Sequence, residues 1–209
     1  MKLVIPTIFA KTKKEFNDRL ARLSPISKNL QIDFMDGKFV KAKSISLKDI
    51  PDLKKFKNNF EAHLMCLHPE KYLSQLKKKG FKKVIFHIET TIHPEELIQK
   101  IKNLKMKPMV AINPKTPIEK LPKKVPVLFM GVNPGEESQS FIPTLYKKIK
   151  SFRQKNKRIA IQVDGGVSPR NAKRLAESGV DAINSGSYIS EAENPIRSLE
   201  ELKRLFKCN

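Results

Sequence analysis

Apolar positions along the chain alternate between two spacings. Short runs with a period of two predict strands, and longer segments with a period near 3.6 predict helices. Eight strands are expected, over residues 2–9, 30–37, 59–66, 82–89, 107–114, 125–134, 158–166 and 181–189. Several of them are apolar on both faces, as in a buried parallel sheet. Helical segments are expected between most strands, over 12–23, 68–80, 93–105, 116–121, 141–152, 168–179 and 198–206.

Residues at the ends of these segments support the helix boundaries. Thr12 and Glu15 have the spacing of a capping box, and Gly179 stands where a helix is expected to stop. Two units are weaker than the others. The segment 44–56 has no clear helical pattern, and Pro122 cuts the fifth helix short.

Eight alternating strand–helix units in one chain predict an α/β fold of the TIM (β/α)8 barrel type. The chain has 209 residues, so this is a compact barrel that we expect to form a single domain over residues 1–209. A doubly wound open sheet is the structural alternative. It expects a glycine-rich turn after the first strand, and the stretch PTIFAKT contains no glycine.

The chain is strongly basic, with 42 Lys and Arg, 21 Asp and Glu, and a formal net charge of +21. Such a charge suits nucleic-acid binding. However, the lysines are scattered over every segment and greatly outnumber the arginines on which specific contacts depend. Solvated helix faces are the simpler interpretation, and steering of an anionic substrate is a third. We therefore do not expect a nucleic-acid partner.

Three further features concern the compartment. No run of about 18 apolar residues exists, so no membrane span is expected. The apolar run near the N-terminus is shorter than a signal peptide needs, and we interpret it as the first strand. Cys66 and Cys208 lie far apart and form no C-x-x-C pair, so reduced thiols are expected. Together these features predict a cytoplasmic protein.

Polar residues gather at the carboxyl ends of the predicted strands, where TIM barrels build their active sites. They are Asp33, Asp36, His63, His87, Glu89, Asn113, Asn133, Asp164 and Ser185–Ser187. Asp33 and Asp164 are the most informative, because a carboxylate inside a barrel is costly unless a cation or hydrogen bonds compensate it. Simpler roles remain open for others: Asp36 in a turn, His68 and His93 as caps or surface residues, His87 in the interior, and Met35, Met65 and Met130 in the core.

Two glycine-containing tripeptides point to a phosphate. Gly165 and Gly166 follow the seventh strand, and Gly186 and Ser187 follow the eighth. Glycines let backbone amides approach an anion, and a following helix start adds partial positive charge. TIM barrels often bind phosphate at these two loops. The pair therefore predicts a phosphorylated ligand.

The sequence resembles the ribulose-phosphate 3-epimerase family through nearly the whole chain. The matching pieces are IPTIFA, IDFMDGKFV, HLMCLHPEKYL, FHIE, AINPKTP, FMGVNPG, VDGGV and SGSYI, in the family's order. The most specific of them are MDG-x-F-V, H-L-M and V-D-G-G-V. The resemblance implies a TIM barrel of the ribulose-phosphate-binding type.

The resemblance also implies an activity, namely interconversion of D-ribulose 5-phosphate and D-xylulose 5-phosphate at C3. Asp33 and Asp164 match the two catalytic aspartates. One divalent metal ion (zinc, iron, manganese or magnesium) is implied at Asp33, His63 and Asp164, with Gln31 as a further candidate ligand. The substrate or phosphate-binding positions are Thr7, Met35, His63, Met65, Met130, Gly135, Gly165, Gly166, Gly186 and Ser187. A homo-oligomer is compatible with this family.

Two departures from the family pattern affect the site. The family signature opens H-x-D, and here it reads Gln31-Ile32-Asp33, which replaces an imidazole by a weaker, neutral oxygen ligand. The loop after the sixth strand, glycine-rich in the family, contains Glu136-Glu137 beside the expected phosphate. Three alternatives therefore stay open: an epimerase of another phosphorylated ketose, a non-catalytic phosphosugar-binding barrel and a basic nucleic-acid-binding barrel.

Overall fold

A computed structural model describes residues 2–135 and 139–207. Eight parallel strands pair in sequence order and close into a barrel, with β1 hydrogen-bonded to both β2 and β8. The strands are β1 (Leu3–Ile8), β2 (Asn29–Met35), β3 (Asn59–Met65), β4 (Lys83–His87), β5 (Lys107–Ile112), β6 (Val127–Met130), β7 (Ile161–Asp164) and β8 (Ala182–Ser185). The predicted TIM barrel is confirmed, and the open-sheet alternative is wrong.

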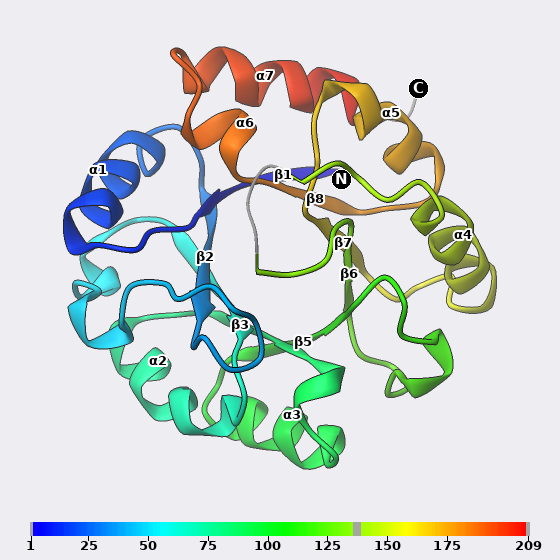
Figure 1. The fold of residues 1–209 in the computed structure, drawn as a ribbon, viewed down its shortest axis with the longest axis horizontal. Helices are drawn as coiled ribbons and strands as arrows, with labels where there is room; N and C mark the ends of the chain where they lie inside the picture. Colours follow the sequence, from blue (N-terminus) through cyan, green and yellow to red (C-terminus); the bar gives the residue numbers. More distant parts are fainter. Residues whose placement is uncertain (1, 136–138, 208–209) are drawn as a thin grey trace.

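Helices surround the ring of strands (Figure 1). They are α1 (Lys13–Leu23), α2 (Leu73–Lys79), α3 (Pro94–Asn103), α4 (Leu145–Lys155), α5 (Pro169–Glu177), α6 (Ser187–Ser190) and α7 (Pro195–Leu205). Short 3-10 turns occupy Leu47–Asp49, Leu53–Lys55, Pro69–Tyr72, Ile88–Thr90 and Ile118–Lys120. The two weak units thus lack an α-helix and contain only such turns. Within the described residues, no helix is long and apolar enough to cross a membrane.

The helix signals read from the sequence act as expected at several ends. The capping box of α1 forms, with the Glu15 amide donating to the Thr12 hydroxyl and the Glu15 carboxylate accepting from the Thr12 amide. Ser168 caps α5 with Pro169 in its first turn, and Gly179, with φ of +88°, follows its end. Large apolar side chains on the inner helix faces, such as Phe16, pack with the outward faces of the strands in one continuous core.

Several predicted boundaries were wrong, and the structure explains three of them through local contacts. The eighth strand ends at Ser185, and the backbone turns at Gly186, so that Ser187–Ser190 form α6 instead of extending the strand. The helix predicted from residue 141 begins at Leu145, because the Ile142 amide donates to the Gly131 carbonyl and holds this segment against the barrel. The last helix starts earlier than predicted, where the Asn194 side chain caps α7.

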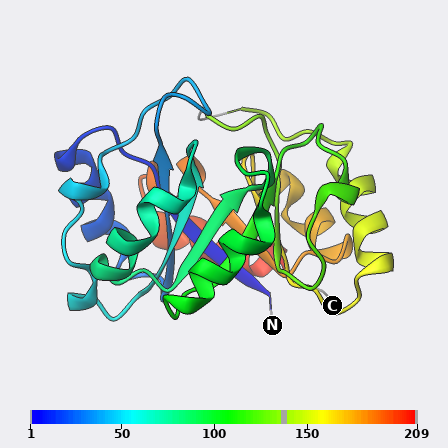
Figure 2. The same ribbon diagram turned by 90° about the horizontal axis from the view of Figure 1, so that it is seen from below.

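The amino ends and the carboxyl ends of the strands lie at opposite ends of the barrel. In Figure 2 the chain enters β1 on the lower side, and the connection after β2 arches over the upper side. All strands are parallel, so their carboxyl ends lie together on that upper side. The residues singled out at strand ends therefore share one end of the barrel, which is where the candidate site lies.

Candidate active site

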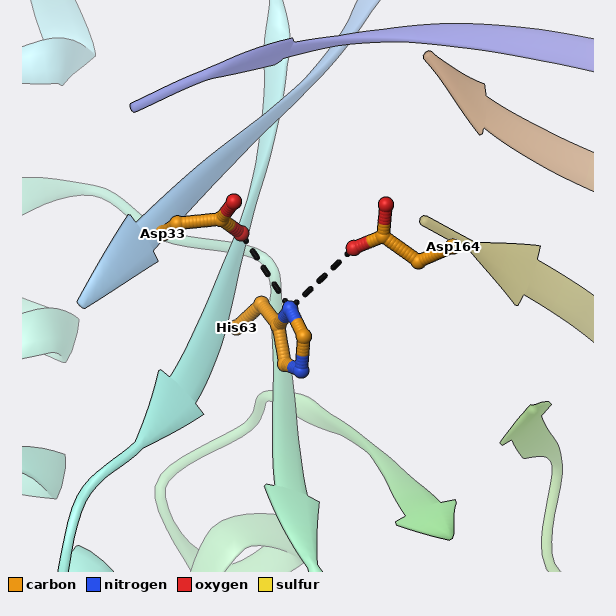
Figure 3. Close-up of side chains that lie close together, drawn as sticks. All are labelled: Asp33, His63 and Asp164. Atoms are coloured by element: carbon orange, nitrogen blue, oxygen red, sulfur yellow. Dashed lines mark hydrogen bonds and ion pairs between the residues drawn. The ribbon is translucent and has the colours of Figure 1, made fainter. Parts of the chain in front are cut away.

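Three side chains from three strands meet inside the barrel. Asp33 lies on β2, His63 on β3 and Asp164 on β7 (Figure 3). His63 Nδ1 is 3.1 Å from Asp33 Oδ1 and 3.2 Å from Asp164 Oδ2. The two carboxylates, one from β2 and one from β7, therefore contact the same ring nitrogen. Their residues are 8% and 7% exposed, and His63 is fully buried.

Strand geometry explains why these residues meet. In the parallel ladder between β2 and β3, Asp33 is opposite His63, and between β6 and β7, Met130 is opposite Asp164. Neighbouring residues in register point to the same face of a sheet, and alternate residues along a strand return to it. Gln31 therefore shares the interior face with Asp33, one layer lower in the barrel.

Gln31 contacts both carboxylates through its amide nitrogen. Its Nε2 donates to Asp33 Oδ1 at 3.0 Å and to Asp164 Oδ2 at 2.6 Å. Its Oε1 points the other way and accepts a hydrogen bond from Asn184 Nδ2 at 2.7 Å. A role for Gln31 as an oxygen ligand of a metal requires the opposite orientation of this amide.

The charges in the cluster are tightly coupled. Burial raises the pKa of Asp33 from 3.8 to about 6, and the neighbouring Asp164 charge adds to this, while His63 and Gln31 act against it. Burial alone would lower the pKa of His63, but its contacts with Asp164 and Asp33 outweigh burial and raise the pKa to about 9. Without a metal, the arrangement is thus an imidazolium between two acids.

A second histidine, His87 on β4, extends this cluster. Its Nε2 lies 3.0 Å from His63 Nε2, and the two rings stack at 5.1 Å between centroids. Burial lowers the pKa of His87, so it is neutral and accepts the His63 N–H. His87 Nδ1 faces Glu89 Oε2 at 3.4 Å. The sequence left an interior role open for His87, but it did not reveal that His87 contacts His63.

The acids open into a cavity of about 920 Å³ at the upper end of the barrel. Thr7, Met35, Met65, Met130, Gly135, Gly165, Gly166, Gly186 and Ser187, all chosen from the sequence, line it together with Asp33 and Asp164. Its volume lies in the usual range for small-molecule sites. Thr7 Oγ1 is buried without a hydrogen-bond partner among the described residues, so a ligand hydroxyl or carbonyl is its natural partner.

The loop after β7 requires its glycines. Gly165 and Gly166 have φ of +96° and +65°, a region that other residues rarely adopt. A Cβ on Gly166 would lie 2.8 Å from the backbone nitrogen of Phe141. Above Gly186, by contrast, the nearest atom to such a Cβ is 4.0 Å away, on Thr7. One glycine loop is thus packed against protein, and the other leaves open space for a ligand.

Two arginines that line the cavity were not identified as site residues from the sequence. Arg170 and Arg174 of α5 line the cavity, and the Arg174 guanidinium lies 4.1 Å from the centre of the Tyr146 ring. Arg170 directly follows the Ser168-Pro169 helix start, which is the signal that identifies it. Glu136 and Glu137 fall outside the described residues. His68 and His93 are surface residues, each with 64% of the side chain exposed.

Asp33, His63 and Asp164 form a group that fits a divalent metal. Their ligand atoms all lie within 4.8 Å of one another, and all three residues are buried. Two carboxylate oxygens and an imidazole nitrogen suit zinc, iron or manganese. A cation here would replace the proton between His63 Nδ1 and the two acids.

Comparison with known proteins decides the family. The model of the "Ribulose-phosphate 3 epimerase family" matches residues 3–190. The chain belongs to the ribulose-phosphate 3-epimerase family. A cytoplasmic ribulose-phosphate 3-epimerase of Oryza sativa is 35% identical over 90% of this chain and 85% of its own length. The ribulose-phosphate 3-epimerase of Synechocystis is 34% identical, over 79% of this chain and 76% of its own length.

Solved structures with lower sequence identity share the fold of this family member. KGPDC from Streptococcus mutans superposes with a TM-score of 0.77 at 13% identity, covering 99% of this chain and 100% of that one. A 3-hexulose-6-phosphate synthase superposes with a TM-score of 0.72 at 15% identity, again covering 99% and 100%. These likenesses support the barrel fold of this chain.

Proposed function

We propose that the protein interconverts D-ribulose 5-phosphate and D-xylulose 5-phosphate by inverting C3. The observation that carries the proposal is the pair of carboxylates, Asp33 on β2 and Asp164 on β7, which approach one buried nitrogen to 3.1 and 3.2 Å and can place an oxygen each within 4.8 Å of one another. Inversion at carbon needs a base on one face and an acid on the other. Two acids that flank one point meet that need.

The proposed reaction is a proton transfer in which one of the two aspartates acts as the base and the other as the acid. One carboxylate takes the C3 proton, the electron pair moves into the neighbouring carbonyl, and the resulting enediolate is planar at C3. The other group, in its acid form, returns a proton to the opposite face. In the metal-free chain, burial raises the pKa of Asp33 to about 6, which brings its proton affinity closer to neutral pH.

Asp33, His63 and Asp164 are the residues that would hold a divalent metal. Such an ion supplies a Lewis acid that lowers the barrier to enolisation. We propose zinc, iron, manganese or magnesium, and His63 as a nitrogen ligand favours the first three. His87, which accepts the His63 Nε2 proton, would orient the ring so that Nδ1 faces the ion.

The rest of the cavity suits a phosphorylated sugar. Gly135, Gly165, Gly166, Gly186 and Ser187 lie where backbone amides can approach the phosphate, and Arg170 and Arg174 add positive charge nearby. Thr7 offers its unpartnered hydroxyl to the sugar. Met35, Met65 and Met130 supply an adaptable apolar wall against the reacting carbons.

We also propose that residues 1–209 act as one domain in the cytosol, with a small phosphorylated sugar as partner and no membrane or nucleic-acid partner. A homo-oligomer is consistent with this proposal. The excess positive charge of +21 would speed the arrival of an anionic substrate.

A second candidate is an epimerase of a longer phosphorylated ketose, such as a ketohexose 6-phosphate. The cavity of about 920 Å³ is the observation that favours it, because a pentose phosphate fills only part of that space.

The direct test supplies ribulose 5-phosphate to the purified full chain in deuterated water, with zinc, iron, manganese or magnesium added in turn. Formation of xylulose 5-phosphate with deuterium at C3 is the expected result. Conversion of a ketohexose 6-phosphate alone would favour the second candidate. Binding of ribulose 5-phosphate without any exchange at C3 would instead indicate a non-catalytic phosphosugar-binding barrel.

A further inference from the structure

A chain of buried polar side chains crosses the barrel below the two acids. Gln31, Glu61, Gln162 and Asn184 are between 0% and 4% exposed. Three of them stand two residues before a residue of the Asp33, His63 and Asp164 cluster, and so face the same interior. Four buried polar groups in one layer are costly unless they satisfy one another, and here they do.

The lower end of this chain is an ion pair. Lys83 Nζ lies 2.6 Å from Glu61 Oε2 and also donates to Gln162 Oε1 at 3.2 Å. A lysine only donates and an ionised carboxylate only accepts. These two groups therefore fix the Gln162 amide, whose oxygen faces Lys83 and whose Nε2 donates to Glu61 Oε1 at 2.5 Å.

The orientation of the Gln162 amide determines that of Asn184, which in turn determines that of Gln31, through hydrogen bonds. Gln162 Nε2 also donates to Asn184 Oδ1 at 2.6 Å. Asn184 Nδ2 then donates to Gln31 Oε1 at 2.7 Å and to Glu61 Oε1 at 3.2 Å. With its oxygen occupied, Gln31 can only present N–H groups to the acids, and it donates one to each. Every amide in the chain has one orientation consistent with Lys83, Glu61 and the two aspartates.

We propose that Lys83, Glu61, Gln162 and Asn184 are positioning residues that hold the Gln31 amide with its nitrogen toward Asp33 and Asp164. Gln31 is then a fixed hydrogen-bond donor that spaces the two carboxylates, and not a fourth metal ligand. The protein ligands of the ion would then be two carboxylates and one imidazole. The inference deepens the proposed function, on which it rests for the role of the two acids.

Reversal of the Gln31 amide shows what the chain prevents. A half-turn about its last bond would set Oε1 against both carboxylates and Nε2 against Asn184 Nδ2. Two attractive contacts would become oxygen–oxygen contacts, and the third would oppose two donors. Removal of the Asn184 donor is therefore the smallest change that allows the reversed amide, in which Oε1 faces a bound cation.

The test uses Asn184→Leu in the full chain without substrate, because leucine keeps the branched shape and removes the amide. The first readout is hydrogen exchange of the Gln31 side-chain amide by NMR, assigned from its loss in Gln31→Leu. Exchange should be slow in the wild type and at least tenfold faster in Asn184→Leu. Equal exchange rates in the two proteins would overturn the proposal.

The second readout is Mn²⁺ affinity by calorimetry. Asn184→Leu should bind Mn²⁺ about tenfold more tightly, since Gln31 can then turn its oxygen to the ion. In the Gln31→Leu background the same substitution should have no effect. An equal effect in both backgrounds would mean that Asn184 acts by another route. If neither the wild type nor Asn184→Leu binds Mn²⁺, the comparison of their Gln31 amide exchange rates is the test of the proposal.

Lys83→Met offers an independent test if Asn184→Leu does not fold. It removes the donor at the far end of the chain and should also speed exchange of the Gln31 amide. Lys107→Met is the matched control, because Lys107 is likewise the first residue of its strand, pairs with Lys83 in the sheet and lies exposed. An effect of Lys107→Met as large as that of Lys83→Met would contradict the proposal. All these measurements hold whether or not the protein proves to be an epimerase.

Discussion

The two halves of the barrel interior differ in chemistry. Strands β2, β3, β7 and β8 fill their half with Gln31, Asp33, Glu61, His63, Gln162, Asp164 and Asn184. Strands β4–β6 and the residue Val132 after them contribute a separate apolar cluster, made of Ile85, Met109, Ala111, Leu128, Met130 and Val132. Strand β4 also carries His87 and Lys83, which contact the polar groups. Both groups of strands belong to the same closed parallel sheet.

The difference separates two tasks within one ring of strands. Apolar side chains in the barrel centre provide the packing that TIM barrels ordinarily use there. In the polar half, hydrogen bonds and ion pairs between buried polar side chains take the place of apolar packing. Substitutions of the polar residues should therefore change activity and metal binding. Substitutions of apolar-cluster residues that do not line the cavity, such as Leu128, should change stability.

The largest effect is expected from Asp33→Asn and Asp164→Asn. Each removes one proton-transferring group and keeps its shape, so epimerisation should fall on the order of 10³-fold or more. Turnover of ribulose 5-phosphate measures the loss, and circular dichroism checks the fold. Asp18→Asn, which removes the same charge at an exposed position of α1, is the control and should keep full activity. Full activity in either active-site variant would exclude the two-acid mechanism.

The next effect concerns the apolar half. Leu128 is fully buried inside the barrel, and Leu128→Ala should lower the free energy of unfolding by about 2–5 kcal/mol through lost burial and a cavity. Turnover per folded molecule should stay close to that of the wild type. Urea unfolding with a parallel rate assay gives both numbers. Loss of turnover without loss of stability would contradict the division between the halves.

Gln31→His sharpens the comparison from the polar side. Histidine offers a nitrogen ligand where Gln31 offers only N–H donors, so divalent metal affinity should rise by about tenfold or more. Calorimetric titration with Mn²⁺ or Zn²⁺ measures the change. An unchanged affinity would mean that position 31 does not reach the bound ion.

Thr7→Val should have a smaller effect: it should weaken substrate binding but leave the stability of the fold equal or slightly higher. Thr7 Oγ1 is buried without a partner among the described residues, so its loss should leave stability equal or slightly higher. Loss of one hydrogen bond to substrate should raise KM by roughly two- to tenfold. A fall in stability with unchanged KM would show that the hydroxyl serves the fold.

The smallest effect concerns Cys66 in the outer apolar core. Burial raises the pKa of this thiol from 9.0 to about 12. The folded thiol stays neutral while the unfolded one ionises above pH 9, so this group makes stability fall as pH rises from about 9 to about 12. Iodoacetamide at pH 8.5 should label Cys66 only after unfolding, as peptide mapping would show. Rapid labelling of the folded chain would contradict its burial.

The sequence predicted most of the fold because its signals were local. Alternating runs located the strands, and Thr12, Glu15 and Gly179 located helix ends. The eighth strand was predicted too long, because no residue in SGSYI is a clear strand breaker other than Gly186. The Ile189 and Ser190 amides instead donate to the Gly186 carbonyl and start α6.

Prediction of the site was less complete, and the omissions share one cause. Asp33, His63 and Asp164 stood out by their residue types, and the structure brings them together. Within their own strands, Glu61, Gln162 and Asn184 show no pattern that marks them as site residues. Their partners lie up to 153 positions away in the sequence and become neighbours only when the barrel closes. The orientation of the Gln31 amide depends on all of them, so no local pattern could give it.

The central claim, that Asp33 and Asp164 act on opposite faces of C3, is tested most directly by reciprocal exchange. Asp33→Asn and Asp164→Asn are each incubated in deuterated water with ribulose 5-phosphate and, separately, with xylulose 5-phosphate. Each variant keeps one base, so it should exchange the C3 proton of one epimer without converting it, and the two variants should act on different epimers. Exchange of the same epimer by both variants, or epimerisation by either at the wild-type rate, would contradict the account.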